Sequence, residues 1–447
     1  MRGLAAAFIL LPSAALACAL PPSVILTLPT GHYIAAAGAT VAITALMGAA
    51  AHRMPQLRAV QLAEGVDRFP FALTSYLSLL AFFGLVLVGL LGPTDPMHNL
   101  MTLVFWTGVW IALPLASMLL GNLWAGLSPW LAAVRIARVL IGRDGSVGLA
   151  RFGQWPAVAG LFAFSWFQMV SMAPDDPRVL AQAALVYWAL IFVAAVLEGE
   201  DWLQKGEFLT VFFGMIARIA PVWRERAGGR VRWFAGFPAA QVVRMPALSA
   251  SEVAFVTLAL AGLTFDGLSE TFFWLALVGE NPLEFTGRSA VQGVNTAGLI
   301  GVWAATVLAV LGALRLGRAL GGGFAAGPVV LSFLAIAAGY HAAHYLVMLL
   351  TAGQFTLSAL NDPLFRGDAW LGLPPFYVSF GFLSVGWVGT SGYAAQFVAI
   401  LGAHLLAVVL ALRLAGPSRA VAHLPLTVLM VGYTVLGLWL LSTARGI

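Results

Sequence analysis

The sequence contains few charged residues and almost no cysteine. Asp, Glu, Lys and Arg make up 9% of its 447 residues, whereas soluble domains carry about 25%. Hydrophobic residues account for 61%, so the composition excludes a soluble enzyme and predicts a polytopic protein embedded in a lipid bilayer. The single cysteine, Cys18, excludes an intramolecular disulfide and any cysteine-based zinc or iron–sulfur centre. A metal ion would have to be bound by His, Asp, Glu or Tyr.

The sequence also lacks the short motifs of several enzyme and nucleic-acid-binding classes. It contains no Walker loop, dinucleotide-binding fingerprint, helix-turn-helix pattern or G-x-S-x-G nucleophile motif. The formal net charge is +5, but the positions of the arginines follow membrane topology rather than an anionic partner. We therefore predict no nucleic-acid partner.

Hydrophobic runs of about 20 residues predict the membrane spans. Ten runs are long enough, at 31–51, 70–92, 98–122, 155–172, 179–197, 251–270, 290–314, 324–351, 393–412 and 425–442. If the first span runs inward, 18 of the 23 Lys and Arg residues fall in the inner loops, in agreement with the positive-inside rule. We predict an all-α bundle of about ten spans in a bacterial inner membrane, with a periplasmic C-terminus.

Four segments divide the chain. Residues 1–20 resemble a signal peptide that ends in a small-residue cleavage site, and an uncleaved first helix is the alternative. Residues 31–199 form a first half of five spans, and residues 251–447 form a second half that carries the polar site. An odd number of spans in each half allows opposite orientations, as in inverted-repeat transporters. Residues 200–250 are predicted to be a cytoplasmic linker.

Two inner segments are predicted to lie on the membrane surface rather than to cross it. The first is 128–143, in which arginines alternate with apolar residues so that one face meets lipid and the other meets headgroups. Its lipid-facing residues are expected to be Trp130, Val134 and Ile141. The second is the apolar stretch 206–221, in the linker.

The second half carries a group of ionisable residues at bilayer depth. His341 and His344 are three residues apart on one predicted helix, so they project from nearly the same face. Asp266 and Glu270 are four residues apart on another. A rise of about 1.5 Å per residue places Asp266 about 8 Å, His344 about 10 Å and His404 about 16 Å below the outer boundary of the hydrocarbon core. Such groups are costly unless paired, ligated or hydrated, so they indicate a functional site. Hydrogen bonding between helices is the alternative.

Further polar side chains are predicted to line this outward-opening site and to contact its ligand. They are Tyr340, Tyr345, Gln354, Asp362 and Gln396. The aromatic outer connection at 355–392 could cover the site, or it could form an interfacial aromatic belt.

Three function classes agree with these residues. In the first, a metalloenzyme, a zinc, iron or manganese ion activates water for attack on an ester. Its metal ligands would be His341, His344, His404 and Asp266, and its catalytic groups would be Asp266 and Glu270. In the second, the same residues bind a proton, an ion or a small molecule from the periplasmic side in a coupled transporter. In the third, His344 and His404 are the axial ligands of a haem. Residue spacing does not separate the three.

Several short stretches also carry a family resemblance. They are GYHAAHYLVMLLTAGQ, NDPL, LGAH and VGYTVLGLWLLS, with NLWAGLSPW, PDDP and LTFDG upstream. Together they resemble a group of bacterial multi-pass membrane proteins commonly labelled fenitrothion hydrolase, and the likeness covers most of the chain after residue 20. The resemblance implies a membrane-bound enzyme that hydrolyses an organophosphate ester. The motif residues of the group correspond to Asp266, His344, Gln354, Asp362 and His404, whereas His341 and Glu270 have no counterpart.

Overall fold

The computed structural model describes residues 30–50, 56–66, 71–284, 287–321, 323–374, 378–381 and 385–443. The predicted signal-like leader, residues 1–20, lies outside this part of the chain. Within it, nine helices are long and apolar enough to cross a membrane. The fold is therefore the multi-pass all-α bundle that the composition predicts.

The nine long helices overlap the predicted spans, although the helices predicted to end at 314 and 351 continue to Leu320 and Asn361. They are α1 (Thr30–Ala50), α2 (Phe71–Leu91), the continuous run of α3 (Leu100–Leu103), η1 (Val104–Ala112) and α4 (Leu113–Leu120), α8 (Pro177–Glu198), α11 (Ala250–Ser269), α13 (Arg288–Leu320), α14 (Ala326–Val329) with α15 (Phe333–Asn361), α16 (Gly386–Leu414) and α17 (Leu424–Ser442). The remaining predicted span, 155–172, is α7 (Trp155–Val170), which has only 16 residues.

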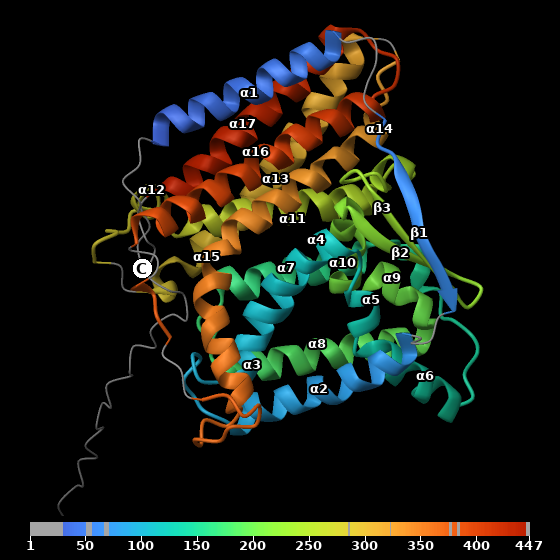
Figure 1. The fold of residues 1–447 in the computed structure, drawn as a ribbon, viewed down its shortest axis with the longest axis vertical. Coiled ribbons are helices and arrows are strands. Elements are labelled where there is room, and N and C mark those ends of the chain that lie inside the picture. Colours follow the sequence, from blue (N-terminus) through green and yellow to red (C-terminus); the bar gives the residue numbers. More distant parts are fainter. Residues whose placement is uncertain are drawn as a thin grey trace, which may run out of the picture.

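The helices form two groups that do not coincide with the two halves of the sequence. In Figure 1, α11, α13, α16 and α17 lie together in the upper part of the molecule, and α2 and α8 lie together in the lower part. Helix α1, although it belongs to the first half, packs against α16 and α17. Helix α7 also belongs to the first half, and it packs against α11 and α13 of the upper group.

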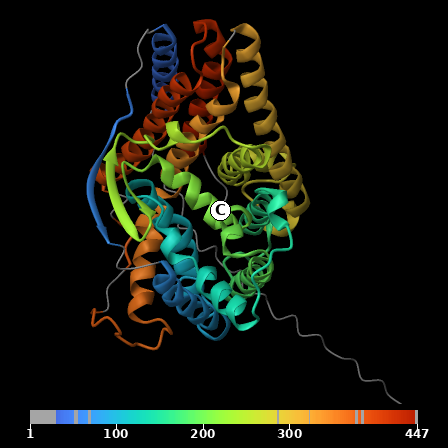
Figure 2. The ribbon, with the colours of Figure 1, turned by 90° about the vertical axis from the view of Figure 1, so that its right-hand side faces the viewer.

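A small antiparallel sheet lies at the periphery of the bundle, as Figures 1 and 2 show. Its strands are β1 (Ala59–Val66), β2 (Val222–Ala227) and β3 (Arg230–Gly236), in the order β1-β3-β2. Gly228 and Gly229 form the β2–β3 turn with φ of 57° and 72°, a conformation that hairpin turns require and glycine adopts without strain. The linker prediction missed this hairpin, although a Gly-Gly pair between two alternating segments is a hairpin signal.

Helix α6 (Trp130–Leu140) is amphipathic, but the apolar residues that it exposes are not all the ones that the sequence predicts. Trp130 and Val134 are buried against the protein rather than facing lipid, because the Trp130 indole donates a hydrogen bond to the backbone carbonyl of Trp188, at 3.0 Å. The exposed apolar residues are Ile136 within the helix and Val139, Leu140 and Ile141 at its end, and of the three residues predicted to face lipid only Ile141 is among them. On the polar side, a hydrogen-bonded ion pair with Glu200 raises the pKa of the Arg135 guanidinium.

The second predicted surface helix is a buried one. Helix α10 (Phe208–Ile216) has apolar side chains all around its axis, and all but one of its residues are buried. A surface helix would bury one face only, so this prediction is wrong. Its first turn is capped by Glu207, which is fully buried and accepts hydrogen bonds from the backbone N–H groups of Leu209 and Thr210. A short helix can end inside a membrane protein when protein groups satisfy its backbone in this way.

Candidate functional site

The centre of the candidate site is a contact between α11 and α15. Asp266 stands near the end of α11, and its Oδ2 atom lies 2.9 Å from Nε2 of His344 on α15. The side chains are 15% and 7% exposed, respectively. The two residues thus form the buried pair that their predicted depths allowed, and the imidazole is held where a proton can be shared with the carboxylate.

The Tyr345 hydroxyl joins this pair to helices of the first half of the chain. It donates a hydrogen bond to Asp266 Oδ2 at 2.7 Å and accepts hydrogen bonds from Trp110 Nε1 at 3.1 Å and Gln168 Nε2 at 2.9 Å. One donor and two acceptor positions are all that a hydroxyl has. The Gln168 amide also lies 3.3 Å from Asp266 Oδ2. The Tyr345 hydroxyl therefore uses all its hydrogen-bond positions and joins three helical segments, η1, α7 and α11, whereas Nδ1 of His344 has no partner among the described residues.

His341 is held by a backbone carbonyl on the neighbouring helix. Its Nε2 atom lies 2.9 Å from the carbonyl oxygen of Trp110, within the π-helical segment η1. In an α-helix the Trp110 carbonyl would accept a hydrogen bond from the backbone N–H of residue 114. Because Pro114 has no backbone N–H, that bond cannot form, and the carbonyl can accept one from His341. A carbonyl only accepts, so Nε2 must carry the hydrogen and Nδ1 must carry a lone pair. His341 is fully buried, and Nδ1 has no hydrogen-bond partner in the described part of the chain.

A small cavity adjoins this network. It has a volume of about 20 Å³ and is lined by Asp266, His341, Tyr345, Gln168 and Trp110, together with apolar residues that include Phe212 of α10. A water molecule needs about 10–15 Å³ on this measure. The cavity therefore has room for one water molecule beside the polar network.

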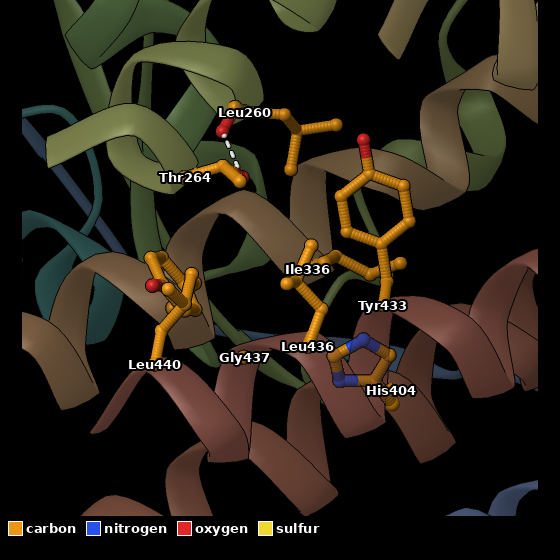
Figure 3. Close-up of a pocket in the computed structure, with 9 residues that line it drawn as sticks. Leu260, Thr264, Ile336, His404, Tyr433, Leu436, Gly437 and Leu440 are labelled. Atoms are coloured by element: carbon orange, nitrogen blue, oxygen red, sulfur yellow. Dashed lines mark hydrogen bonds between the residues drawn. The ribbon is translucent and has the colours of Figure 1, made fainter. Parts of the chain in front are cut away.

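His404 lies in a different cavity. Its Nδ1 atom is 2.8 Å from the carbonyl oxygen of Ile400, one turn earlier in α16, and its Nε2 atom has no partner among the described residues. The cavity that it lines, shown in Figure 3, has a volume of about 10 Å³ and lies between α11, α15, α16 and α17. Asp266, His344 and His404 were expected to surround one cavity. The structure instead places Asp266 and His404 beside two different cavities.

Tyr340 lies between the His404 cavity and His344. It lines the His404 cavity, and its ring stacks on His344 with centroids 5.8 Å apart and an interplanar angle of 22°. Two glycines make room for it, since a Cβ atom would lie 2.8 Å from the Tyr340 hydroxyl at Gly267 and 3.2 Å from its ring at Gly437. The predicted Tyr340–His344 pairing is therefore present in the structure.

Two of the predicted ligand-contacting residues hold the outer connection instead. Gln354 bonds both the backbone N–H and the carbonyl of Ser379, at 3.1 and 3.0 Å. Asp362 accepts hydrogen bonds from the backbone N–H groups of Arg366 and Gly367, at 2.9 and 2.7 Å. These contacts give both residues a structural role in shaping the connection after α15.

The remaining predicted residues lie at the edge of the site. Gln396 donates a hydrogen bond from α16 to the carbonyl of Ala343 on α15, at 2.8 Å, directly before His344. Glu270 is the residue that follows α11, and it is half-buried. Gln396 therefore supports the helix that carries the histidines, while Glu270 stands about one turn beyond Asp266.

The sequence-based prediction missed the contributions of the first half and of the linker. Trp110 and Gln168 bond the site directly, and Phe212 on α10 packs against His341 with ring centroids 5.8 Å apart. Gln168 stands inside the predicted span 155–172, and an amide within hydrocarbon is itself a signal of an interhelical contact. Trp110 and Phe212 carry no such signal, because aromatic residues are common in membrane helices.

The arrangement does not complete the predicted metal or haem sites. His344 donates to a carboxylate, as metal-binding histidines do, but the described residues contain no group of three His, Cys, Asp or Glu that could hold an ion. The cavities of about 10 and 20 Å³ beside His404 and Asp266 are far too small for a haem. A metal or haem stays a prediction from the sequence.

Fold and site together define the class: a multi-pass helical membrane protein with a buried, hydrogen-bonded cluster of polar residues. No family model matches the chain, and no curated protein or solved structure shows significant similarity to it. The function therefore has to be argued from the site.

Proposed function

We propose that this protein is a proton-coupled membrane carrier in which the Asp266–His344 pair binds and releases the proton. The observation that carries the proposal is the 2.9 Å contact between these two nearly buried side chains on helices long and apolar enough to cross a membrane. Ionisable groups within a membrane bundle commonly form proton relays or ion sites.

The charge of the cluster depends on one proton. Asp266 Oδ2 accepts hydrogen bonds from His344, Tyr345 and Gln168, and of these three partners only the imidazole can carry a positive charge. With the shared proton present, the carboxylate and imidazole form a neutral group or an ion pair. Without it, the pair is a net negative charge in a low-dielectric interior, which is costly. Proton binding and loss therefore change the energy of this region strongly enough to favour different conformations.

The size of the cavity favours a proton over an organic ester as the species bound in this conformation. Pockets that hold drug-sized ligands have volumes of about 300–1,000 Å³, whereas the cavity beside Asp266 has about 20 Å³. The family resemblance implies an organophosphate ester as the substrate. Such an ester would enter this cavity only if the surrounding helices moved far apart. A proton and one water molecule need no opening.

Infrared difference spectroscopy between acidic and alkaline buffer tests the proposal on the full chain in lipid bilayers. A buried carboxyl group gives a carbonyl band that differs in position and in hydrogen–deuterium exchange from that of solvated carboxyl groups. We expect this band in the wild type and its loss in Asp266→Asn, with a shift in His344→Gln. Identical spectra for the wild type and Asp266→Asn would refute the proposal.

The chain offers a matched control. Asp95 and His98 form a second carboxylate–imidazole contact, at 2.7 Å, but their side chains are 56% and 37% exposed. Asp95→Asn removes the same chemical group, a carboxylate that contacts an imidazole, but at a solvent-exposed position. This variant should keep the buried band, because surface pairs interact weakly and exchange with water.

A further inference from the structure

The ring of His404 carries a buried hydrogen-bond acceptor that lies outside the Asp266–His344 pair. Nδ1 must carry the hydrogen, because its partner is the carbonyl oxygen of Ile400, which only accepts. Nε2 therefore carries a lone pair. His404 is 1% exposed, and Nε2 has no hydrogen-bond partner in the described part of the chain. Buried polar atoms of this kind are usually satisfied by protein or by ordered water.

The cavity beside this nitrogen has the size and the lining that a water molecule needs. Its volume of about 10 Å³ is close to the lower limit for one water. Thr264 and Tyr433 line the same cavity, as Figure 3 shows, and their hydroxyl groups donate elsewhere, to the carbonyl of Leu260 and to Thr306 respectively. Each hydroxyl oxygen keeps acceptor capacity, so acceptors are present for both hydrogens of one water.

We infer that the cavity between α11, α15, α16 and α17 is a binding site for a single water molecule that donates a hydrogen bond to Nε2 of His404. The site is distinct from the cavity beside Asp266. Tyr340 lies between this cavity and the Asp266–His344 pair, since it lines the cavity and its ring stacks on His344. The bound water is thus positioned to exchange hydrogen with the neighbouring pair. This last step rests on the proposed function, whereas the water site does not.

Solid-state NMR of the full chain, labelled with nitrogen-15 at histidine and held in lipid bilayers, tests the water site directly. Magnetisation transferred from exchangeable water protons should reach an unprotonated Nε2 of His404, while Nδ1 carries a hydrogen. His404→Gln identifies the resonance by its disappearance. A His404 Nε2 signal with no water contact, or a hydrogen on Nε2 and none on Nδ1, would overturn the inference.

A pair of threonine variants tests the same site without changing the histidine. Thr264→Val keeps the shape but removes a hydroxyl of the cavity, so the water contact at His404 should weaken. Thr434→Val is the control, because the Thr434 hydroxyl, like that of Thr264, bonds a carbonyl of its own helix, at Met430, but Thr434 does not line the cavity. Equal water contacts in the two variants would contradict the assigned lining.

The exchange step has a separate readout. If the water serves the Asp266–His344 pair, hydrogen–deuterium exchange of the buried carboxyl band should slow severalfold in Thr264→Val and stay unchanged in Thr434→Val. A band that exchanges at the wild-type rate in both variants refutes the exchange step alone. Absence of the band in the wild type refutes the proposed function and leaves the NMR result for the water site standing.

Discussion

Tyr345→Phe removes one oxygen atom and breaks three hydrogen bonds of the candidate site. The hydroxyl bonds Asp266, Trp110 and Gln168 at distances of 2.7, 3.1 and 2.9 Å. Hydrogen bonds inside membrane proteins contribute about 0.6 kcal/mol on average and about 1.7 kcal/mol at most, so losing three should lower the free energy of unfolding by about 2–5 kcal/mol. The phenyl ring keeps the packing, and the loss can be assigned to the hydroxyl.

The assay is reversible unfolding in mixed detergent and lipid micelles, with Tyr433→Phe as the matched control. The Tyr433 hydroxyl makes one hydrogen bond, to Thr306 at 3.1 Å, so its loss should cost only about 0.6–1.7 kcal/mol. A Tyr345 variant that is no less stable than the Tyr433 variant would show that the three-way network does not hold the helices together. The proposed role of the Tyr345 hydroxyl in the site would then be refuted.

The remaining predictions concern packing, metal content and topology. Gly339→Ala should destabilise the fold by about 1–3 kcal/mol, because its Cβ would lie 2.2 Å from that of Ala403, whereas Gly353→Ala in the same helix meets no atom within 4 Å and should be neutral or slightly stabilising. If the Asp266–His344 pair carries a proton as proposed, metal analysis of the purified protein should find no stoichiometric ion, and an ion that is present in the wild type but lost in His344→Ala would favour the predicted metalloenzyme instead. A reporter fused after Ile447 should be active on the periplasmic side, and cytoplasmic activity would overturn the predicted span count or direction.

The topology prediction draws on two independent observations. The arginine distribution places the inner loops on one side of the membrane. In Figure 1, α17 begins next to the end of α1, so the two helices run in opposite directions and α17 ends on the side where α1 begins. The even number of crossings that this arrangement needs is met if α7 crosses together with the nine long helices.

The sequence alone determined the class of the protein and the course of its helices. Hydrophobic run length depends only on consecutive residues, so all nine long helices and α7 could be located from the printed chain. The pairing of Tyr340 with His344 was also predictable, because residues four apart in a helix share a face. These properties are local, so they do not depend on which helices pack together.

The tertiary structure decided which polar groups meet. Nothing in the spacing says that Gln168 and Trp110 reach Tyr345, or that His404 opens into a separate cavity, because these contacts depend on which helices are neighbours. The same holds for α10, which is apolar enough for lipid but is enclosed by protein, and for α1, which packs far from its sequence neighbours. In a bilayer, lipid and protein interiors are equally apolar, so hydrophobicity places a helix in the membrane without choosing its partners. Side-chain packing and interhelical hydrogen bonds make that choice, and they exist only once the helices are assembled.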